Sequence, residues 1–243
     1  MTMPALIPLG SHTGKPPIPL RRPVLLIGSR NIAHLHLLSS KVSKAHALII
    51  NSDGKIYIRD LASRTHVYVN GEQVREADLK HNDLIKIGSF VFRLAIPAAW
   101  QTRPRDSKAD PAQLEVEGAE LPVRLDQRVT LIGRRPTCDV SLLEDSASTA
   151  HAVIFEMGGR RFIRDLGSRT GTFVNGRTIH QEELSFGDVI RIGETEFRYA
   201  PAPAMPVGPV PADEIDTDLD ELEDLVGTAP LMEEPPEVIA KRL

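Results

Sequence analysis

The chain has 243 residues, 41% of them hydrophobic and 26% charged, with a formal net charge of −4, values typical of a soluble protein of one large or two small domains. It contains no apolar run long enough to span a bilayer, and its first residues lack the basic start and apolar core of a secretory signal. The single cysteine, Cys138, excludes an intrachain disulfide and a zinc-finger pattern and favours a reducing cytoplasm.

The first part of the chain predicts a β-protein. Residues 1–15 are expected to form a flexible N-terminus, and 16–97 contain several short runs of β-branched and aromatic residues, which predict strands. Asn70-Gly71 lies between two such runs and indicates a hairpin, because a type I′ turn needs a positive φ at both central positions. Further strand-like runs are KIYIRDL at 55–61, NDLIKIG at 82–88 and FVFRL at 90–94.

The second part of the chain repeats the first. Residues 98–112 are rich in proline, alanine and charge and predict a linker to a second domain at 113–200. Positions 23–94 and 128–199 align without a gap, at a constant offset of 105 and with 30 identities, which indicates a duplicated domain. Because neither copy shows a sustained helical period, we predict an all-β fold of two sandwiches in tandem.

The last segment, 201–243, is proline-rich and then strongly acidic. It carries a net charge of −9, which leaves +5 on the preceding 200 residues. A mildly basic body favours anionic ligands, yet it is much less basic than a dedicated DNA-binding domain, so we expect no nucleic-acid partner. The tail is expected to be disordered or to form a short helix, because apolar residues from Ile215 to Val226 recur at helical spacing.

Three loops of the second copy carry residues suited to a phosphate group. Arg134 follows a strand that ends at Gly133, Ser148 precedes the next strand, and Arg169 lies in a third loop. Loops at one end of a sandwich cluster together, so these segments are expected to meet. Guanidinium groups and a hydroxyl supply the charge-assisted hydrogen bonds that a phosphomonoester accepts. The sequence therefore predicts a phosphate-binding pocket.

The motifs of the second copy resemble a known family. Gly-Arg, Asp-Val-x-Leu, S-x-x-H-A, D-L-x-S-R-x-G-T-x-V-N-G and G-D-x-I-x-I-G occur in this order, and they resemble the forkhead-associated (FHA) domain over about 20–95 and 118–200. The resemblance implies eleven-stranded sandwiches whose end loops bind phosphothreonine peptides without catalysis, cofactor or metal. The implied partners are phosphothreonine-containing proteins, a Ser/Thr protein kinase and the protein's own tail, phosphorylated at Thr217 or Thr228. No membrane partner is expected, because the sequence has no apolar run long enough to span a bilayer.

The resemblance also implies a role for each candidate site residue of the second copy. Arg134 binds the phosphate, Ser148 contacts it, and Arg169 lines its edge. Thr149 stands where an Arg or Asn often adds a contact. Thr170 stands in place of an Asn that usually binds the peptide backbone, so the second copy departs from the family pattern at this position.

The first copy departs further from the family pattern. Ser29 stands in place of Arg134, and His66-Val67 replaces Gly171-Thr172. A histidine reaches a glycine conformation only at an energetic penalty, so this loop is expected to differ or to be strained. The counterparts of the site residues are Arg30, Ser43, Lys44, Arg64 and Thr65. We expect the first copy to bind phosphopeptides weakly or to serve as a scaffold only.

Other functions have less support in the sequence. No Gly-rich phosphate loop, nucleophile elbow or H-E-x-x-H motif is present, so no enzyme is expected. His34 and His36 share one face of an extended segment, but a third metal ligand is not evident nearby. His151 is expected to brace a loop. The alternative to phosphothreonine binding is a phospho-independent scaffold that uses both domains and the acidic tail.

Overall fold

The computed structural model describes residues 2–52, 55–101, 108–116 and 121–203. The regular secondary structure of these residues is almost entirely β, with eleven strands in each repeat, which confirms the predicted fold class. Met1–Ala204 form one compact unit. Among the described helices, none has the length and hydropathy that a bilayer crossing requires. The predicted tail helix and both tail threonines lie outside the described residues.

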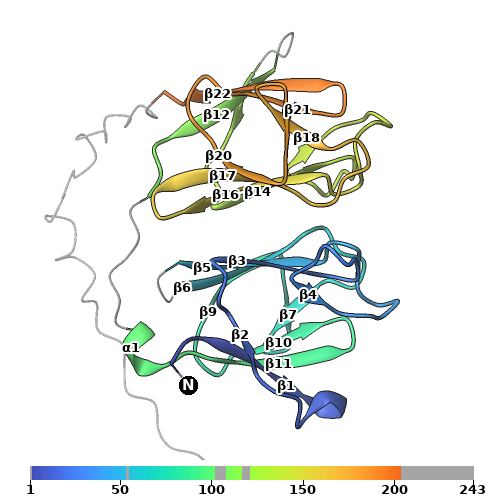
Figure 1. Ribbon diagram of the computed structural model, residues 1–243, viewed down its shortest axis with the longest axis vertical. Helices are drawn as coiled ribbons and strands as arrows, with labels where there is room; N and C mark the ends of the chain where they lie inside the picture. Colours follow the sequence, from blue (N-terminus) through green and yellow to red (C-terminus); the bar gives the residue numbers. More distant parts are fainter. Residues whose placement is uncertain (1, 53–54, 102–107, 117–120, 204–243) are drawn as a thin grey trace, which may run out of the picture. The chain divides into compact units, whose positions relative to one another are not determined.

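The first repeat is a sandwich of two sheets (Figure 1). One sheet has the order β2-β1-β11-β10-β7-β8 and the other β4-β3-β5-β6-β9. The strands are β1 (Ala5–Leu9), β2 (Ile18–Pro19), β3 (Val24–Gly28), β4 (Leu35–His36), β5 (Ala47–Ser52), β6 (Lys55–Asp60), β7 (Val67–Val69), β8 (Glu72–Val74), β9 (Glu76–Leu79), β10 (Leu84–Ile87) and β11 (Phe90–Ala95). A 3-10 turn, η1 (Gly10–His12), follows β1, and a short helix, α1 (Ala98–Gln101), follows β11.

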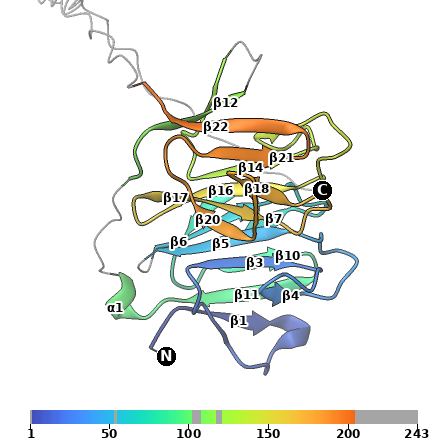
Figure 2. The same ribbon diagram turned by 45° about the horizontal axis from the view of Figure 1, so that its top comes forward.

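The second repeat has the same topology (Figure 2). Its sheets have the orders β13-β12-β22-β21-β18-β19 and β15-β14-β16-β17-β20. The strands are β12 (Ala112–Val116), β13 (Val123–Arg124), β14 (Val129–Gly133), β15 (Val140–Ser141), β16 (Ala152–Met157), β17 (Arg160–Asp165), β18 (Thr172–Val174), β19 (Arg177–Ile179), β20 (Gln181–Glu183), β21 (Val189–Ile192) and β22 (Thr195–Pro201).

The N-terminal segment differs from the expectation of a flexible end before residue 16. Ala5–Leu9 forms β1, which pairs along its whole length with β11, and Leu6 is fully buried in the core. The proline at position 8 obscured the strand, because a proline cannot donate to a ladder. β2 pairs only with Ala5 and Leu6, so Pro8 lies where β1 has no second neighbour. The first sandwich therefore begins before the expected boundary.

The sheets that contain β3 and β14 are apolar on both faces. Leu25 and Ile27 of β3 face the core of their own sandwich, whereas Val24 and Leu26 belong to a separate cluster. This cluster joins the two repeats, and it includes Leu48, Ile50 and Tyr57 from the first repeat and Val129, Leu131, Val153 and Phe155 from the second. Burial on both faces explains why these strands read as continuous apolar runs rather than alternating ones.

The contact between the repeats has approximate two-fold symmetry at the offset of 105. Arg59 donates to Asp139 at 2.6 Å, and the equivalent pair is Arg164 and His34, whose Nη2 and Nε2 atoms lie 3.1 Å apart. Asp139 accepts from Leu131 N at 2.7 Å, as His34 Nδ1 accepts from Leu26 N at 3.1 Å. A carboxylate thus holds one arginine, whereas an imidazole faces the other.

This environment acts on the ionisation of His34. Burial, and then the positive charge of Arg164, lower the pKa of His34 from 6.5 to about 4. Desolvation likewise lowers the pKa of Arg164. His34 is therefore neutral at pH 7, and it is engaged between the repeats rather than in the metal pair considered from sequence. Within the described residues, no cluster of three or more metal-ligating side chains occurs.

Candidate functional site

The loops at one end of both sandwiches line a single cavity of about 450 Å³. The first repeat contributes Arg30, Ser43, Lys44, Ala45, Leu61 and Arg64, and the second contributes Arg134, Arg135, Asp145, Ala147, Ser148, Thr149, Ala150, Leu166 and Arg169. Every contributor from the first repeat has its equivalent from the second, at the offset of 105. The structure thus brings together four of the five residues predicted in the second repeat and four of the five in the first.

Glycine allows the first two loops to approach each other closely. A Cβ added to Gly133 would lie 2.7 Å from the carbonyl oxygen of Thr149, a distance that real Cβ atoms essentially never show. This approach lets Arg134 N donate to Ser148 O at 2.9 Å. Gly28 meets the carbonyl of Lys44 in the same way in the first repeat. The glycine at the end of the strand therefore sets the position of the arginine beside the serine.

A buried histidine braces the loops, as the sequence predicts. His151 Nδ1 accepts from Ser148 N at 3.0 Å, so its other nitrogen carries the proton and donates to Gly171 O at 3.0 Å. Its side chain is fully buried and lies away from the cavity lining. His46 makes the equivalent bonds in the first repeat, and burial lowers its pKa. Both histidines connect the serine loop to the third loop.

The serine hydroxyl lies between the second and third loops. Ser148 Oγ accepts from Arg169 N at 3.0 Å, as Ser43 Oγ accepts from Arg64 N at 3.1 Å. Accepting this bond leaves the hydroxyl proton of each serine available for a ligand. The arrangement gives each repeat a hydroxyl donor at the cavity with a fixed position.

Arg134 lies at the cavity with a weakly held guanidinium group. Its Nη1 atom contacts Asp145 Oδ1 at 2.8 Å, and the two side chains are 45% and 96% exposed. A surface ion pair of this kind contributes about 0–1 kcal/mol, so a dianionic ligand competes with it easily. Arg169 donates from the same side of the cavity to the backbone oxygen of Asp145. Asp145 was not identified from sequence, because the pattern gives no signal for a carboxylate at that position.

Two predicted site residues do not line the cavity. Thr170 Oγ1 donates to Ser146 O at 3.0 Å, and Thr65 Oγ1 donates to Lys41 O at 2.6 Å. Both hydroxyls therefore connect the third loop to the second. Arg135, which lies at the offset of 105 from Arg30, lines the cavity instead.

The third loop of the second repeat is organised by one carboxylate. Asp165 accepts from Gly167 N at 2.8 Å, from Ser168 N at 3.0 Å and from the Ser168 hydroxyl. It also accepts from Thr172 Oγ1 at 2.8 Å, and that hydroxyl is fully buried. Asp60 keeps only two of these four bonds, both from Ser63, and Val67, which replaces the threonine, has no hydroxyl to donate.

The altered turn of the first repeat keeps the geometry of the second and is strained. His66 has φ +58° and Gly171 has φ +79°, so both occupy the left-handed region. Of the two expectations, a different loop or a strained one, the structure therefore supports strain. The left-handed conformation costs a non-glycine residue about 1–2 kcal/mol, partly offset by the chain entropy that glycine loses on folding.

Substitutions at these two positions should change the free energy of unfolding in opposite directions. We expect His66→Gly to raise the free energy of unfolding by about 0.5–1 kcal/mol, the left-handed penalty less the entropy term. Gly171→Ala should lower it by a similar amount, because its Cβ would meet only ordinary contacts at 3.6 Å or more. Urea denaturation of both full-length variants measures the effects. A destabilised His66→Gly protein would contradict the strain interpretation.

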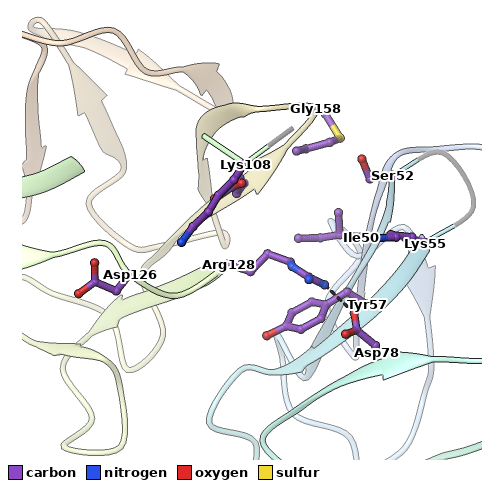
Figure 3. A pocket seen from close by; sticks show the side chains of 11 residues that line it. Ile50, Ser52, Lys55, Tyr57, Asp78, Lys108, Asp126, Arg128 and Gly158 are labelled. Carbon is purple, nitrogen blue, oxygen red and sulfur yellow. Dashed lines mark hydrogen bonds and ion pairs between the residues drawn. The ribbon is translucent and has the colours of Figure 1, made fainter. Parts of the chain in front are cut away.

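A second cavity, of about 530 Å³, is lined by both charges and apolar groups (Figure 3). Arg128 pairs with Asp78 at 2.6 Å and stacks on the Tyr57 ring at 4.7 Å from its centroid. Burial and a hydrogen bond to Glu76 raise the pKa of Tyr57, which keeps its hydroxyl protonated. Three cations line this cavity, Lys55, Lys108 and Arg128, and three carboxylates balance them, Asp78, Asp126 and Glu156. The first cavity has six cations and one carboxylate, so it is the better candidate for an anion.

The comparisons with known proteins agree on one family. The family model described as FHA domain matches residues 25–88 and 130–193. Over 70 residues the chain is 39% identical to the oxoglutarate dehydrogenase inhibitor of Corynebacterium jeikeium, covering 29% of this chain and 49% of that protein. Over 79 residues it is 34% identical to the glycogen accumulation regulator GarA of Mycolicibacterium smegmatis, covering 32% and 50%. The chain thus spans about half the length of these relatives.

A similar solved structure is that of Mycobacterium tuberculosis EmbR in complex with a low-affinity phosphopeptide. It is 31% identical, with a TM-score of 0.38, and the match covers 40% of this chain and 26% of that one.

Proposed function

Because the chain belongs to the FHA domain family and carries two copies of the domain, we propose that it is a non-enzymatic signalling adaptor that binds phosphothreonine-containing proteins, mainly through the second repeat. The observation that carries this proposal is the grouping of Arg134, Ser148 and Arg169 around one cavity. A phosphomonoester has a charge of about −1.5 to −2 at neutral pH, which two guanidinium groups and a hydroxyl donor match.

The first repeat is the weaker binder in this proposal. Ser29 stands at the position equivalent to Arg134. The guanidinium group of Arg30 donates a hydrogen bond to the backbone oxygen of Gly167 in the other repeat. Ser43, Lys44 and Arg64 still line the cavity. One charge-assisted hydrogen bond contributes about 1.5–3 kcal/mol, so losing it lowers the affinity of this repeat by about one to two orders of magnitude.

Arg134→Ala tests the proposal in the full-length protein. We expect this variant to bind a phosphothreonine peptide about ten- to hundredfold more weakly than the wild type, because one charged contact to the phosphate is lost. Isothermal titration with a peptide selected from a phosphothreonine library gives the affinities. Arg160→Ala is the matched control, because Arg160 is 65% exposed, pairs with Glu183 and does not line the cavity.

Equal binding of phosphorylated and unphosphorylated peptides, unaffected by Arg134→Ala, would instead support the scaffold alternative. One observation favours that alternative: Leu38 and Leu143 occupy equivalent positions and are 78% and 89% exposed. Leucines at this level of exposure offer apolar contacts that need no phosphate. The proposal also includes a Ser/Thr protein kinase that phosphorylates the partners, and it places the protein in the cytoplasm. The same kind of kinase would phosphorylate Thr217 or Thr228 of the tail.

A further inference from the structure

The cavity is shared by the two repeats in a nearly symmetric way. Ser43 and Ser148 each present a hydroxyl whose oxygen already accepts a backbone N–H from the third loop of the same repeat. The residue that donates this N–H is Arg64 in the first repeat and Arg169 in the second, and all four residues line the same cavity. The cavity therefore contains two sets of phosphate donors rather than one.

The charge of the cavity exceeds what one phosphate needs. Six cationic side chains and a single carboxylate, Asp145, line it. One phosphomonoester neutralises about two of these positive charges. Lys44 Nζ makes no ion pair with any described residue, although it lies beside Ser43. The first repeat thus keeps an unpaired cation next to its own hydroxyl donor.

The contact between the repeats fixes the two donor sets relative to each other. Arg135 donates across to the backbone oxygen of Ala62, and Arg30 donates to the equivalent oxygen of Gly167. Behind these bonds lies the shared apolar cluster, in which Leu26, Leu131 and Phe155 are at most 1% exposed. Side chains buried to this degree cannot separate without exposing a large apolar surface to water. A ligand therefore meets both donor sets at one fixed spacing.

We propose that this cavity is one composite site for a peptide segment that carries two phosphorylated residues. The second repeat holds one phosphate with Arg134, Ser148 and Arg169, and the first repeat holds the other with Lys44, Ser43 and Arg64. This inference rests on the proposed function, because it assumes that the second repeat binds phosphothreonine. The composite site gives the first repeat a role despite its weak affinity for a single phosphate. Once the second repeat has bound one phosphate, the first repeat meets the other phosphate within the same complex, at a high effective concentration.

The test compares peptides with one and with two phosphothreonines on the full-length protein. A panel in which the spacing between the two phosphothreonines varies is titrated by calorimetry, with singly phosphorylated versions carrying glutamate at the other position. We expect one spacing to bind at least about tenfold more tightly than either single peptide, at one peptide per chain, because the second binding event is intramolecular. Lys44→Thr places the residue of the second repeat, Thr149, at the equivalent position. This variant should bind the doubly phosphorylated peptide with a smaller advantage over the singly phosphorylated ones.

Lys80→Thr is the control, because Lys80 is exposed and does not line the cavity. Equal affinity for singly and doubly phosphorylated peptides at every spacing would overturn the composite site and leave the proposed function intact. Two peptides bound per chain would overturn it as well, because the repeats would then act separately. Failure of every phosphothreonine peptide to bind would overturn the proposed function itself.

Discussion

Replacing Asp139 with alanine is expected to lower the free energy of unfolding by about 3 kcal/mol, because it removes the partner of a buried charge. Arg59 is only 2% exposed and Asp139 is 8% exposed. The variant leaves the Arg59 guanidinium desolvated and takes away the acceptor of Leu131 N. Glu76 still pairs with Arg59, which keeps the loss near the lower end of the range for buried pairs. Chemical denaturation measures the difference.

Asp78→Ala provides a matched control for this prediction. Asp78 also pairs with an arginine of the other repeat, Arg128, but the two side chains are 69% and 43% exposed. Exposed pairs contribute about 0–1 kcal/mol, so this variant should remain close to the wild type. Similar losses in Asp78→Ala and Asp139→Ala would show that burial does not set the energy of the pair.

Replacing Asp165 with alanine should lower both stability and phosphopeptide affinity. The variant leaves two backbone N–H groups and the buried Thr172 hydroxyl without their acceptor, at a cost of about 3 kcal/mol in the free energy of unfolding. The loop that carries Arg169 then has to be ordered by the ligand. Ordering a few side chains costs enough to weaken binding by about tenfold. Denaturation and peptide titration measure the two effects separately.

A milder variant tests the same hydrogen bonds to Asp165 one at a time. Thr172→Val gives the second repeat the residue that the first repeat has at this position, and it removes only one of the four hydrogen bonds to Asp165. We expect a loss of about 1 kcal/mol in stability and little change in peptide affinity. Unchanged affinity in Asp165→Ala would mean that this carboxylate does not position the binding loop.

The sequence allowed the sandwich and most of the site to be predicted because their signals are local. Asn-Gly turns, alternating strands and a constant offset of 105 indicate two copies of one β-domain. Placing Arg134, Ser148 and Arg169 on three loops at one end was enough to bring them together. Thr170 was less predictable, because a hydroxyl in such a loop is equally suited to a ligand or to a neighbouring carbonyl, and here it bonds Ser146 O.

The contact between the repeats could not be predicted in the same way. Apolar residues such as Leu26 and Leu131 indicate that both faces of their sheets are covered, but they do not indicate by what. The two repeats share one cavity because of that contact, so the shared cavity could not be predicted from the sequence either. β1 was missed for a different reason: Pro8 broke a run too short to show a period.

The unequal pairs between the repeats bear on which copies associate. Two second repeats from different chains, joined through the same faces, would oppose Asp139 to Arg164 twice, whereas two first repeats would oppose His34 to Arg59 twice. Ion pairing alone thus favours association between second repeats of separate molecules. Joining both repeats in one chain raises their effective concentration toward each other, and this favours the mixed pairing. Covalent linkage of the two repeats therefore favours the contact within one chain over a contact between second repeats of separate chains.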